Sequence, residues 1–248
     1  MNVAFAAVVF APSLVFGSFL NVVAARLPLG RSVVAPSSAC MHCGAEIRSR
    51  DNIPLVSYLL LRGRCRDCGT AIGWRYPAVE IGTALLAALC VLKFGLSLHA
   101  LAAAIFCAAL VTVSATDIEK RIVPNAVVLP AAAVVLALQL WRDPSLQWPL
   151  GGFGAALFLF LAALAYPRGM GMGDVKLALL LGVGVGKDVP VALFAGMIFA
   201  LVPSVALFAR HGSSARKMAI PFAPFLALGG LLALFAGGPI VHWYLSLS

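Results

Sequence analysis

The sequence predicts an all-α polytopic membrane protein with about eight transmembrane helices and one small cytoplasmic domain. Of the 248 residues, 62% are hydrophobic and only 11% are charged, and the mean hydropathy is +1.02. A soluble domain has roughly 25% charged residues. The apolar residues also gather in runs long enough to cross a bilayer, and a single long polar segment interrupts them between residues 26 and 78.

The first apolar run, from Val3 to about Ala25, is expected to be a transmembrane helix, which makes residues 1–25 a segment of their own. A signal peptide would begin with basic residues and end at a small-residue cleavage site. This run has no basic start, and no such site is followed by a secreted domain. Asn21 is a polar side chain inside the run. It either forms a hydrogen bond to another helix or takes part in a functional site.

The polar segment, residues 26–78, is expected to form the small cytoplasmic domain. Lysine and arginine concentrate in cytoplasmic loops of membrane proteins. The apolar island within it, Ile53–Leu61, is too short to span a membrane and is expected to pack on the membrane face of the domain. The segment carries eight arginines, Arg26, Arg31, Arg48, Arg50, Arg62, Arg64, Arg66 and Arg75.

Residues 79–248 are expected to form a membrane core of about seven helices. With the first helix this gives eight spans and places both termini outside. Of the eighteen lysines and arginines, fifteen then lie on the cytoplasmic side and three outside. Topology therefore explains the net charge of +9, which does not imply a nucleic-acid partner. The predicted spans are Val79–Leu96, Leu98–Ala115, Asn125–Leu140, Leu150–Tyr166, Asp174–Val185, Val189–Ala209 and Ile220–Leu245.

Two of the nine acidic residues fall at the cytoplasmic ends of predicted spans. Asp117 ends the third span and Asp174 starts the sixth, so the topology places both at one depth on the cytoplasmic side. Gly171 and Gly173 precede the second aspartate and would let another chain approach it closely. Glu80 begins the second span, where it either pairs with an arginine or supports the site.

A pair of carboxylates at one depth suits water-activated peptide hydrolysis, in which one accepts a proton and the other donates one. Like charges held close together share a proton. The same pair could also serve an ion or proton pathway. Physical arguments alone favour neither the hydrolase nor the transporter. Asp174 lies at a helix N-terminus, where the dipole favours the anion, and Asp117 lies at a C-terminus. We therefore expect Asp174 to be the base and Asp117 the acid.

Four of the six cysteines form two Cys-x-x-Cys knuckles in the polar segment, separated by 21 residues. A glycine follows each knuckle, which suits a tight turn. Four thiolates form a closed tetrahedral site for structural zinc, and the cytoplasm disfavours disulfides. The predicted zinc ligands are Cys40, Cys43, Cys65 and Cys68. The other two, Cys90 and Cys107, lie in apolar runs and are expected to be small buried side chains.

Taken together, these motifs closely resemble the bacterial type IV prepilin leader peptidase/N-methyltransferase family. The resemblance runs from end to end of the chain. It rests on the paired knuckles and on the segments Gly17–Val23, Arg26–Pro28, Asn52–Pro54, Ser57–Tyr58, Arg75–Pro77 with Glu80, Asp117 with Pro124, Gly171–Leu177 and Pro221–Phe225.

The resemblance implies a multi-pass protein of the bacterial inner membrane, with its active site facing the cytoplasm. Members cleave the basic leader from type IV prepilins and from pseudopilins of type II secretion systems. The catalytic aspartates carry over to Asp117 and Asp174. Members with the cysteine domain also N-methylate the new N-terminus with S-adenosylmethionine, whose binding site the residues do not place. Residues with a substrate-binding or supporting role are expected among Gly171, Gly173, Lys176, Asn21 and Glu80.

Two alternatives are a different intramembrane aspartyl protease and a proton-coupled transporter. The full cysteine domain argues against the first. A transporter would show related halves and broken helices at mid-span, and the sequence has neither. Asn125 stands where many members of the resembled family have an acidic residue. This position lies outside the aspartate pair. The sequence does not decide which prepilins are cleaved or the oligomeric state.

Overall fold

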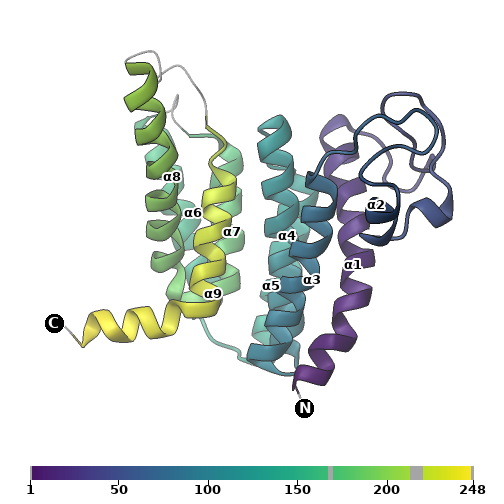
Figure 1. Ribbon diagram of the computed structural model, residues 1–248. Coiled ribbons are helices and arrows are strands. Elements are labelled where there is room, and N and C mark those ends of the chain that lie inside the picture. The colour runs from purple at the N-terminus through teal and green to yellow at the C-terminus, as the bar shows by residue number, and fades with distance from the viewer. Residues whose placement is uncertain (1, 167–169, 213–219, 247–248) are drawn as a thin grey trace. The chain divides into compact units, whose positions relative to one another are not determined.

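The computed structural model describes residues 2–166, 170–212 and 220–246 (Figure 1). Within these ranges the chain is helical, and its β-type pairs are two isolated antiparallel bridges, Ala39 with Glu46 and Arg64 with Ala71. This confirms the predicted all-α class. The helices are α1 (Asn2–Arg26), α2 (Val56–Leu60), α3 (Arg75–Phe94), α4 (Leu98–Lys120), α5 (Asn125–Arg142), α6 (Gln147–Ala165), α7 (Met172–Val185), α8 (Val189–His211) and α9 (Ala223–Leu245), with 3₁₀ turns η1 (Leu27–Leu29), η2 (Ser49–Asp51) and η3 (Gly186–Asp188).

Seven stretches of the described chain are long and apolar enough to cross a membrane, which confirms a multi-pass membrane protein. One of them, Met172–Arg210, contains both α7 and α8. Gly230 and Gly237 of α9 lie against Leu181 and Asp188, so α9 runs parallel to α7. The opposite order holds for α8, because Ala192 lies against Gly229 and Gly196 lies against Leu226. The chain therefore reverses at η3, and α7 and α8 are the two separate helices that the sequence predicted.

The reversal has a local cause in Gly186, whose φ of 58° lies in the left-handed region. Glycine adopts this conformation without steric cost. A helix of 14 residues such as α7 is about 21 Å long, shorter than the ~30 Å hydrocarbon core. Its ends therefore lie near the polar boundary or inside the protein, and Asp174 lies in its first turn.

The helix ends differ from the predicted spans by a few residues. The helix α3 begins at Arg75 rather than Val79, and Pro77 fits in its first turn because proline needs no intrahelical donor there. The helix α4 continues past Ala115 to Lys120, so Asp117 lies inside its last turn. The chain leaves this helix at Arg121, which has a positive φ of 53°.

The chain forms two compact units, residues 1–100 and residues 101–248. In the first unit α1 packs along α3, and Gly17 makes the closest approach. A Cβ on Gly17 would lie 2.8 Å from Glu80 Cα, so only glycine allows this spacing. Further along, Ala6 of α1, Val91 of α3 and Ala100 of α4 form a small buried cluster.

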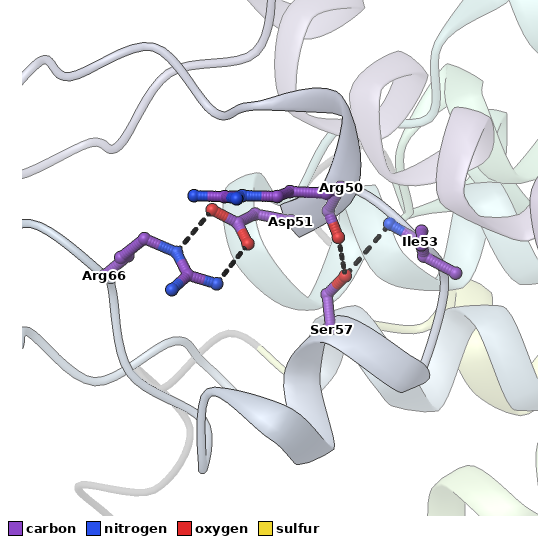
Figure 2. A network of polar contacts seen from close by, with 5 residues as sticks. All are labelled: Arg50, Asp51, Ile53, Ser57 and Arg66. Carbon is purple, nitrogen blue, oxygen red and sulfur yellow. Dashed lines mark hydrogen bonds and ion pairs between the residues drawn. The ribbon is translucent and has the colours of Figure 1, made fainter.

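The polar segment of the first unit has few regular elements and is held by polar contacts (Figure 2). Arg66 forms two hydrogen bonds to the Asp51 carboxylate, at 2.8 Å from Nε and 2.6 Å from Nη2. These bonds hold the pKa of Asp51 below its usual range. The Ser57 hydroxyl at the start of α2 donates to Arg50 O and accepts from Ile53 N, each at 3.0 Å. The exposed face of α2 carries Leu59 and Leu60.

The second unit is organised around α7, whose Leu177, Leu180 and Leu181 are fully buried. Close packing on α6 depends on glycine, because a Cβ on Gly182 would collide with the backbone of Gly151. On the α5 side, Gln139 Nε2 donates to Gly184 O at 3.3 Å. These contacts fix α7 along its length and so determine where its first turn, with Asp174, is held.

Candidate functional site

Asp117 lies in the last turn of α4 and is only 7% exposed. Its Oδ2 accepts a hydrogen bond of 3.0 Å from the backbone N–H of Ala223, the first residue of α9. The first N–H groups of a helix have no intrahelical partner, and the helix dipole favours a negative charge there. The carboxylate of Asp117 therefore caps a helix that begins 106 residues later.

Asp174 caps its own helix. Its Oδ2 accepts a hydrogen bond of 3.2 Å from Gly171 N, and its own backbone N–H donates to Gly171 O at 3.1 Å. The reciprocal pair fixes the first turn of α7 and the direction of the carboxylate. The sequence predicted a span that begins at Asp174; the helix instead begins two residues earlier, at Met172, and Asp174 lies in its first turn.

The two carboxylates lie in the same unit, where Gly173, next to Asp174, packs against Val123, which follows the end of α4 that carries Asp117. Each carboxylate has Oδ2 held by a backbone N–H. Among the described residues, Oδ1 of either carboxylate forms no hydrogen bond. One oxygen of each therefore remains for water or a substrate carbonyl, which is what general acid–base catalysis of hydrolysis needs.

The helix-dipole argument for the roles of the two aspartates is weaker in this geometry. It assumed that only Asp174 lies at a helix N-terminus. Because Asp117 accepts the Ala223 N–H, it also faces an N-terminus, that of α9. At Asp117 the dipoles of the α4 C-terminus and the α9 N-terminus oppose each other, so the helix dipoles distinguish the two aspartates less than the sequence suggested, and the roles of base and acid stay a prediction.

The residues around Asp174 are held by packing and by one polar contact. A Cβ on Gly173 would lie 2.8 Å from the Val123 Cβ, whereas a Cβ on Gly171 would make an ordinary 3.6 Å contact with Asp174 Oδ2. Lys176 Nζ donates to Asn125 Oδ1 at 2.9 Å. Residues two apart on a helix do not face each other, so Lys176 contacts the start of α5 rather than Asp174.

The two other predicted supporting residues belong to the first unit. Asn21 is 3% exposed and its Nδ2 donates to Tyr76 O at 3.0 Å. Glu80 is 7% exposed and its Oε2 accepts from Leu55 N at 2.8 Å. Both line one cavity within residues 18–80. Their role at the aspartate pair remains a prediction.

The four knuckle cysteines come together as predicted. Their sulfurs all lie within 4.8 Å of one another, and the Cys40 and Cys68 sulfurs are 3.8 Å apart. Tetrahedral coordination with Zn–S bonds of about 2.3 Å places the sulfurs ~3.8 Å apart. The donor set and its spacing therefore fit a closed zinc site, which leaves no position for water.

The two knuckles have the same backbone design. Gly44 N donates to Cys40 O at 2.9 Å, and Gly69 N donates to Cys65 O at 3.0 Å. The two glycines have φ of 73° and 70°, which favours glycine at both turns. The glycine that follows each Cys-x-x-Cys in the sequence thus closes the turn that orients the sulfurs.

The thiols of the two knuckles differ in how readily they ionise. Hydrogen bonding to Thr70 lowers the pKa of Cys68 to about 6. At Cys43 the Ala45 N–H favours the thiolate, yet desolvation and the neighbouring sulfurs raise the pKa to about 11. Zinc deprotonates its coordinating thiols, so a bound ion would hold all four as thiolates.

One site contact was missed at the sequence level, the backbone N–H of Ala223. The segment Pro221–Phe225 contributed to the family resemblance without a role. Pro224 at the second position of α9 marks a helix start, where N–H groups are unpaired. That signal predicts a free donor, but not its partner.

Comparison with known proteins gives the family. Residues 12–94 match the bacterial peptidase A24 N-terminal domain, and residues 104–205 match the type IV leader peptidase family. Among curated relatives, the protein of Bacillus subtilis (strain 168) is 34% identical, over 97% of this chain and 98% of its own. The Burkholderia pseudomallei (strain 1026b) relative is 37% identical, over 96% and 87%.

The Pseudomonas aeruginosa relative is 35% identical, over 95% of this chain and 91% of its own. All three relatives carry the name prepilin leader peptidase/N-methyltransferase. No solved structure matches the chain. Both domain matches and the nearly full-length relatives lead to one conclusion: this chain belongs to the type IV leader peptidase family.

Proposed function

We propose that this protein is a membrane aspartyl endopeptidase that removes the leader peptide of type IV prepilins and pseudopilins. We further propose that it N-methylates the new N-terminus with S-adenosylmethionine. The observation that carries the peptidase is the pair of capped carboxylates, Asp117 and Asp174, in a chain of this family. Family membership also favours peptide hydrolysis over proton transport, which the pair alone left open.

In this mechanism the pair holds one proton between its two carboxyl groups. The ionised carboxylate accepts a proton from water as the water oxygen attacks the scissile carbonyl carbon. The protonated carboxyl donates its proton to the carbonyl oxygen, which gives a neutral tetrahedral diol. Collapse of the diol breaks the C–N bond, transfers a proton to the leaving amine and returns the pair to its starting state.

Backbone donors hold the pair in place for these steps. Gly171 N and Ala223 N each fix one oxygen of a carboxylate, so the other oxygens keep a constant position as protons move. Preorganised donors of this kind need no reorganisation during reaction. The first turns of α7 and α9 therefore act as a rigid frame for a substrate bond.

The cleavage site is proposed to face the cytoplasm at the inner membrane. The aspartates lie at the ends of α4 and α7 that adjoin basic segments; Lys120 is the last residue of α4 and Arg121 follows it directly. Basic segments favour the cytoplasmic side. A prepilin has a basic leader followed by an apolar helix, so its helix would lie in the lipid bilayer while the leader stays in the cytoplasm.

Two bound groups belong to this proposal. Zinc at the four cysteines would stabilise the fold of the polar segment without taking part in chemistry, because no coordination position is open. S-adenosylmethionine, when bound, supplies an electrophilic methyl group for the new N-terminal amine.

The test is cleavage of a purified prepilin by the purified protein in detergent. Asp117→Asn and Asp174→Asn should each abolish leader removal. Glu119→Gln is the matched control, since it neutralises an exposed acid on the same helix only two residues from Asp117. It should cleave at the wild-type rate. Retained cleavage in either aspartate variant would refute the assignment of the pair.

A further inference from the structure

A short helix of the polar segment, α2, exposes its apolar face. Val56, Leu59 and Leu60 are 48%, 67% and 77% exposed, and Ile53, just before the helix, is 49% exposed. Residues three and four apart lie on one face of a helix, so these four side chains form one patch, here called the anchor patch. Gathered apolar side chains of this kind mark a site for a protein partner or a membrane, whereas singly scattered ones do not.

The two other side chains of α2 are polar and turn toward the protein. Ser57 is buried, and its hydroxyl is hydrogen-bonded to Arg50 O and Ile53 N (Figure 2). The Tyr58 hydroxyl donates to Ile72 O at 3.5 Å. A helix that meets water normally buries its apolar side and exposes its polar side. The inverted arrangement of α2 therefore indicates that its outer face does not meet water.

The start of α2 is tied to the side of a membrane-spanning helix. Leu55, which precedes α2, donates its N–H to Glu80 Oε2 at 2.8 Å, and Glu80 is a buried residue in the second turn of α3. With 20 residues, α3 is ~30 Å long, about the thickness of the hydrocarbon core. Its first turns therefore lie at the membrane boundary, and α2 begins at that boundary rather than in the water beyond it.

Trp74 marks the same boundary. It directly precedes α3 and is 78% exposed. Tryptophan gathers at membrane–water interfaces, where its apolar ring meets lipid while its N–H stays near the polar headgroups. An exposed tryptophan at the end of a spanning helix therefore supports a bilayer surface at the level of the first turns of α3, which is the level at which α2 begins.

Two arginines follow the anchor patch directly. Arg62 and Arg64 are exposed, and neither forms an ion pair with a residue that the structure describes. Arg62 N donates to Leu59 O at 3.0 Å, which keeps this arginine beside the end of α2. Arg66 differs, because its guanidinium is already bonded to the Asp51 carboxylate. Unpaired cations next to an exposed apolar face suit the phosphate groups of anionic lipids.

We propose that the anchor patch inserts into the membrane leaflet around the first turns of α3, and that Arg62 and Arg64 bind the phosphates of anionic lipids there. The apolar face enters the boundary between headgroups and acyl chains, while the two guanidinium groups stay at the headgroups. The hydrogen bond from Leu55 to Glu80 then connects the inserted helix to α3. The polar segment is thereby held against the bilayer at a fixed height, independently of the peptidase chemistry.

Photo-crosslinking of the full-length protein tests insertion. The photoreactive residue p-benzoylphenylalanine replaces Leu60 in one variant and Met41, an exposed apolar residue of the first knuckle, in the matched control. Each protein is irradiated in nanodiscs of equimolar phosphatidylcholine and phosphatidylglycerol, and mass spectrometry identifies the products. Position 60 should crosslink to lipid at several times the yield of position 41. Equal lipid yields, or products that join position 60 to this chain or to a second copy instead of lipid, would overturn the proposal.

The lipids crosslinked at position 60 also test the two arginines. With Arg62→Gln/Arg64→Gln, the ratio of crosslinked phosphatidylglycerol to phosphatidylcholine should fall about tenfold, since each basic residue near an anionic surface changes the affinity roughly fivefold. Arg48→Gln/Arg50→Gln, the matched control, removes two exposed arginines of the same spacing and should keep the ratio.

All four arginine side chains are exposed, so the unfolding midpoint of both double variants should match the wild type. An unchanged lipid ratio in the Arg62→Gln/Arg64→Gln variant would overturn the phosphate assignment. An equal loss in both double variants would also overturn it, because net charge rather than position would then attract the anionic lipid.

Discussion

The Asp117 carboxylate and the Ala223 backbone N–H form a buried hydrogen bond of 3.0 Å across 106 residues of chain. This bond joins the last turn of α4 to the first turn of α9. Because the donor is a backbone group at a helix start, it cannot rotate away as a side chain could. The position of the Asp117 carboxylate is therefore set by where a distant helix begins.

Ala223→Pro tests this contact, because proline lacks the N–H but fits the first position of a helix. The variant should reduce the rate of leader cleavage about tenfold to a hundredfold, the effect of losing a hydrogen bond to a charged group. The measurement is kcat on a purified prepilin.

Ala223→Gly is the matched control, since it keeps the N–H and adds no volume. It should cleave at close to the wild-type rate. Equal activity of the proline and glycine variants, with both folded, would show that the Ala223 donor has no role in holding Asp117.

Gly173→Ala tests packing around the second aspartate. The new methyl group would lie 2.8 Å from the Val123 Cβ. Overpacking of this kind should lower the free energy of unfolding by about 1–3 kcal/mol. We expect a lower unfolding midpoint and reduced cleavage, with partial recovery of both in Gly173→Ala/Val123→Ala. A clash with substrate rather than with Val123 would leave the midpoint unchanged and allow no such recovery.

Gly171→Ala separates packing from substrate approach. Its Cβ would make only an ordinary 3.6 Å contact, so the unfolding midpoint should match the wild type. If the missing side chain lets a prepilin backbone approach the aspartates, KM should rise severalfold while stability is unchanged. An unchanged KM would restrict the role of this glycine to the turn before α7.

The sequence predicted the aspartate pair because both residues stand where apolar runs meet polar segments. Such boundaries are visible in hydropathy, and charge asymmetry places them on one side of the membrane. The same information could not identify the Ala223 donor, because every helix start has unpaired N–H groups and tertiary packing selects the partner. The dipole argument for Asp174 as base is weakened for this reason, because it considered each aspartate only against its own helix, and the assignment itself stays a prediction.

Asn21 and Glu80 show the same limit in the first unit. Each was predicted to be a polar side chain in a helix, with a polar partner elsewhere in the chain. Their common cavity depends on α1 packing along α3 at Gly17, whose close approach to Glu80 Cα is a property of the folded pair. From the sequence alone, a helix glycine that is required for close packing looks the same as one that is merely allowed at its position. The zinc ligands were easier to predict, because the knuckle spacing is local.

Asn125→Asp tests the polar contact between α5 and α7. Lys176 Nζ already donates to Asn125 Oδ1 at 2.9 Å, so a carboxylate would create an ion pair at the first position of α5. An acid is also favoured there by the helix dipole. We expect stabilisation of about 0.5–1 kcal/mol at low salt, falling as salt rises, measured by unfolding in detergent.

The same substitution in a Lys176→Met background separates the two effects. Only the dipole contribution should remain there, and it should be smaller than the gain in the presence of the lysine. Equal gains in both backgrounds would mean that the lysine does not pair with position 125 at all.

Removal of the zinc ligands tests the metal centre. In the Cys40→Ser/Cys65→Ser variant each knuckle loses one thiolate, and two remaining sulfurs cannot form a closed site. Metal analysis of the purified wild type should give close to one zinc per chain, and the double variant should give almost none. The folding free energy of the polar segment should fall with the metal, since binding of a structural zinc is coupled to folding.

Cys107→Ala is the control, because it removes a buried cysteine of α4 that belongs to no knuckle. It should keep a full zinc complement. Limited proteolysis gives a second readout, because the polar segment should be cut within residues 30–74 in the double variant and be protected in the control. Unchanged zinc content in the double variant would refute the four-cysteine site, whereas lost zinc without new cleavage would show that the segment folds without its metal.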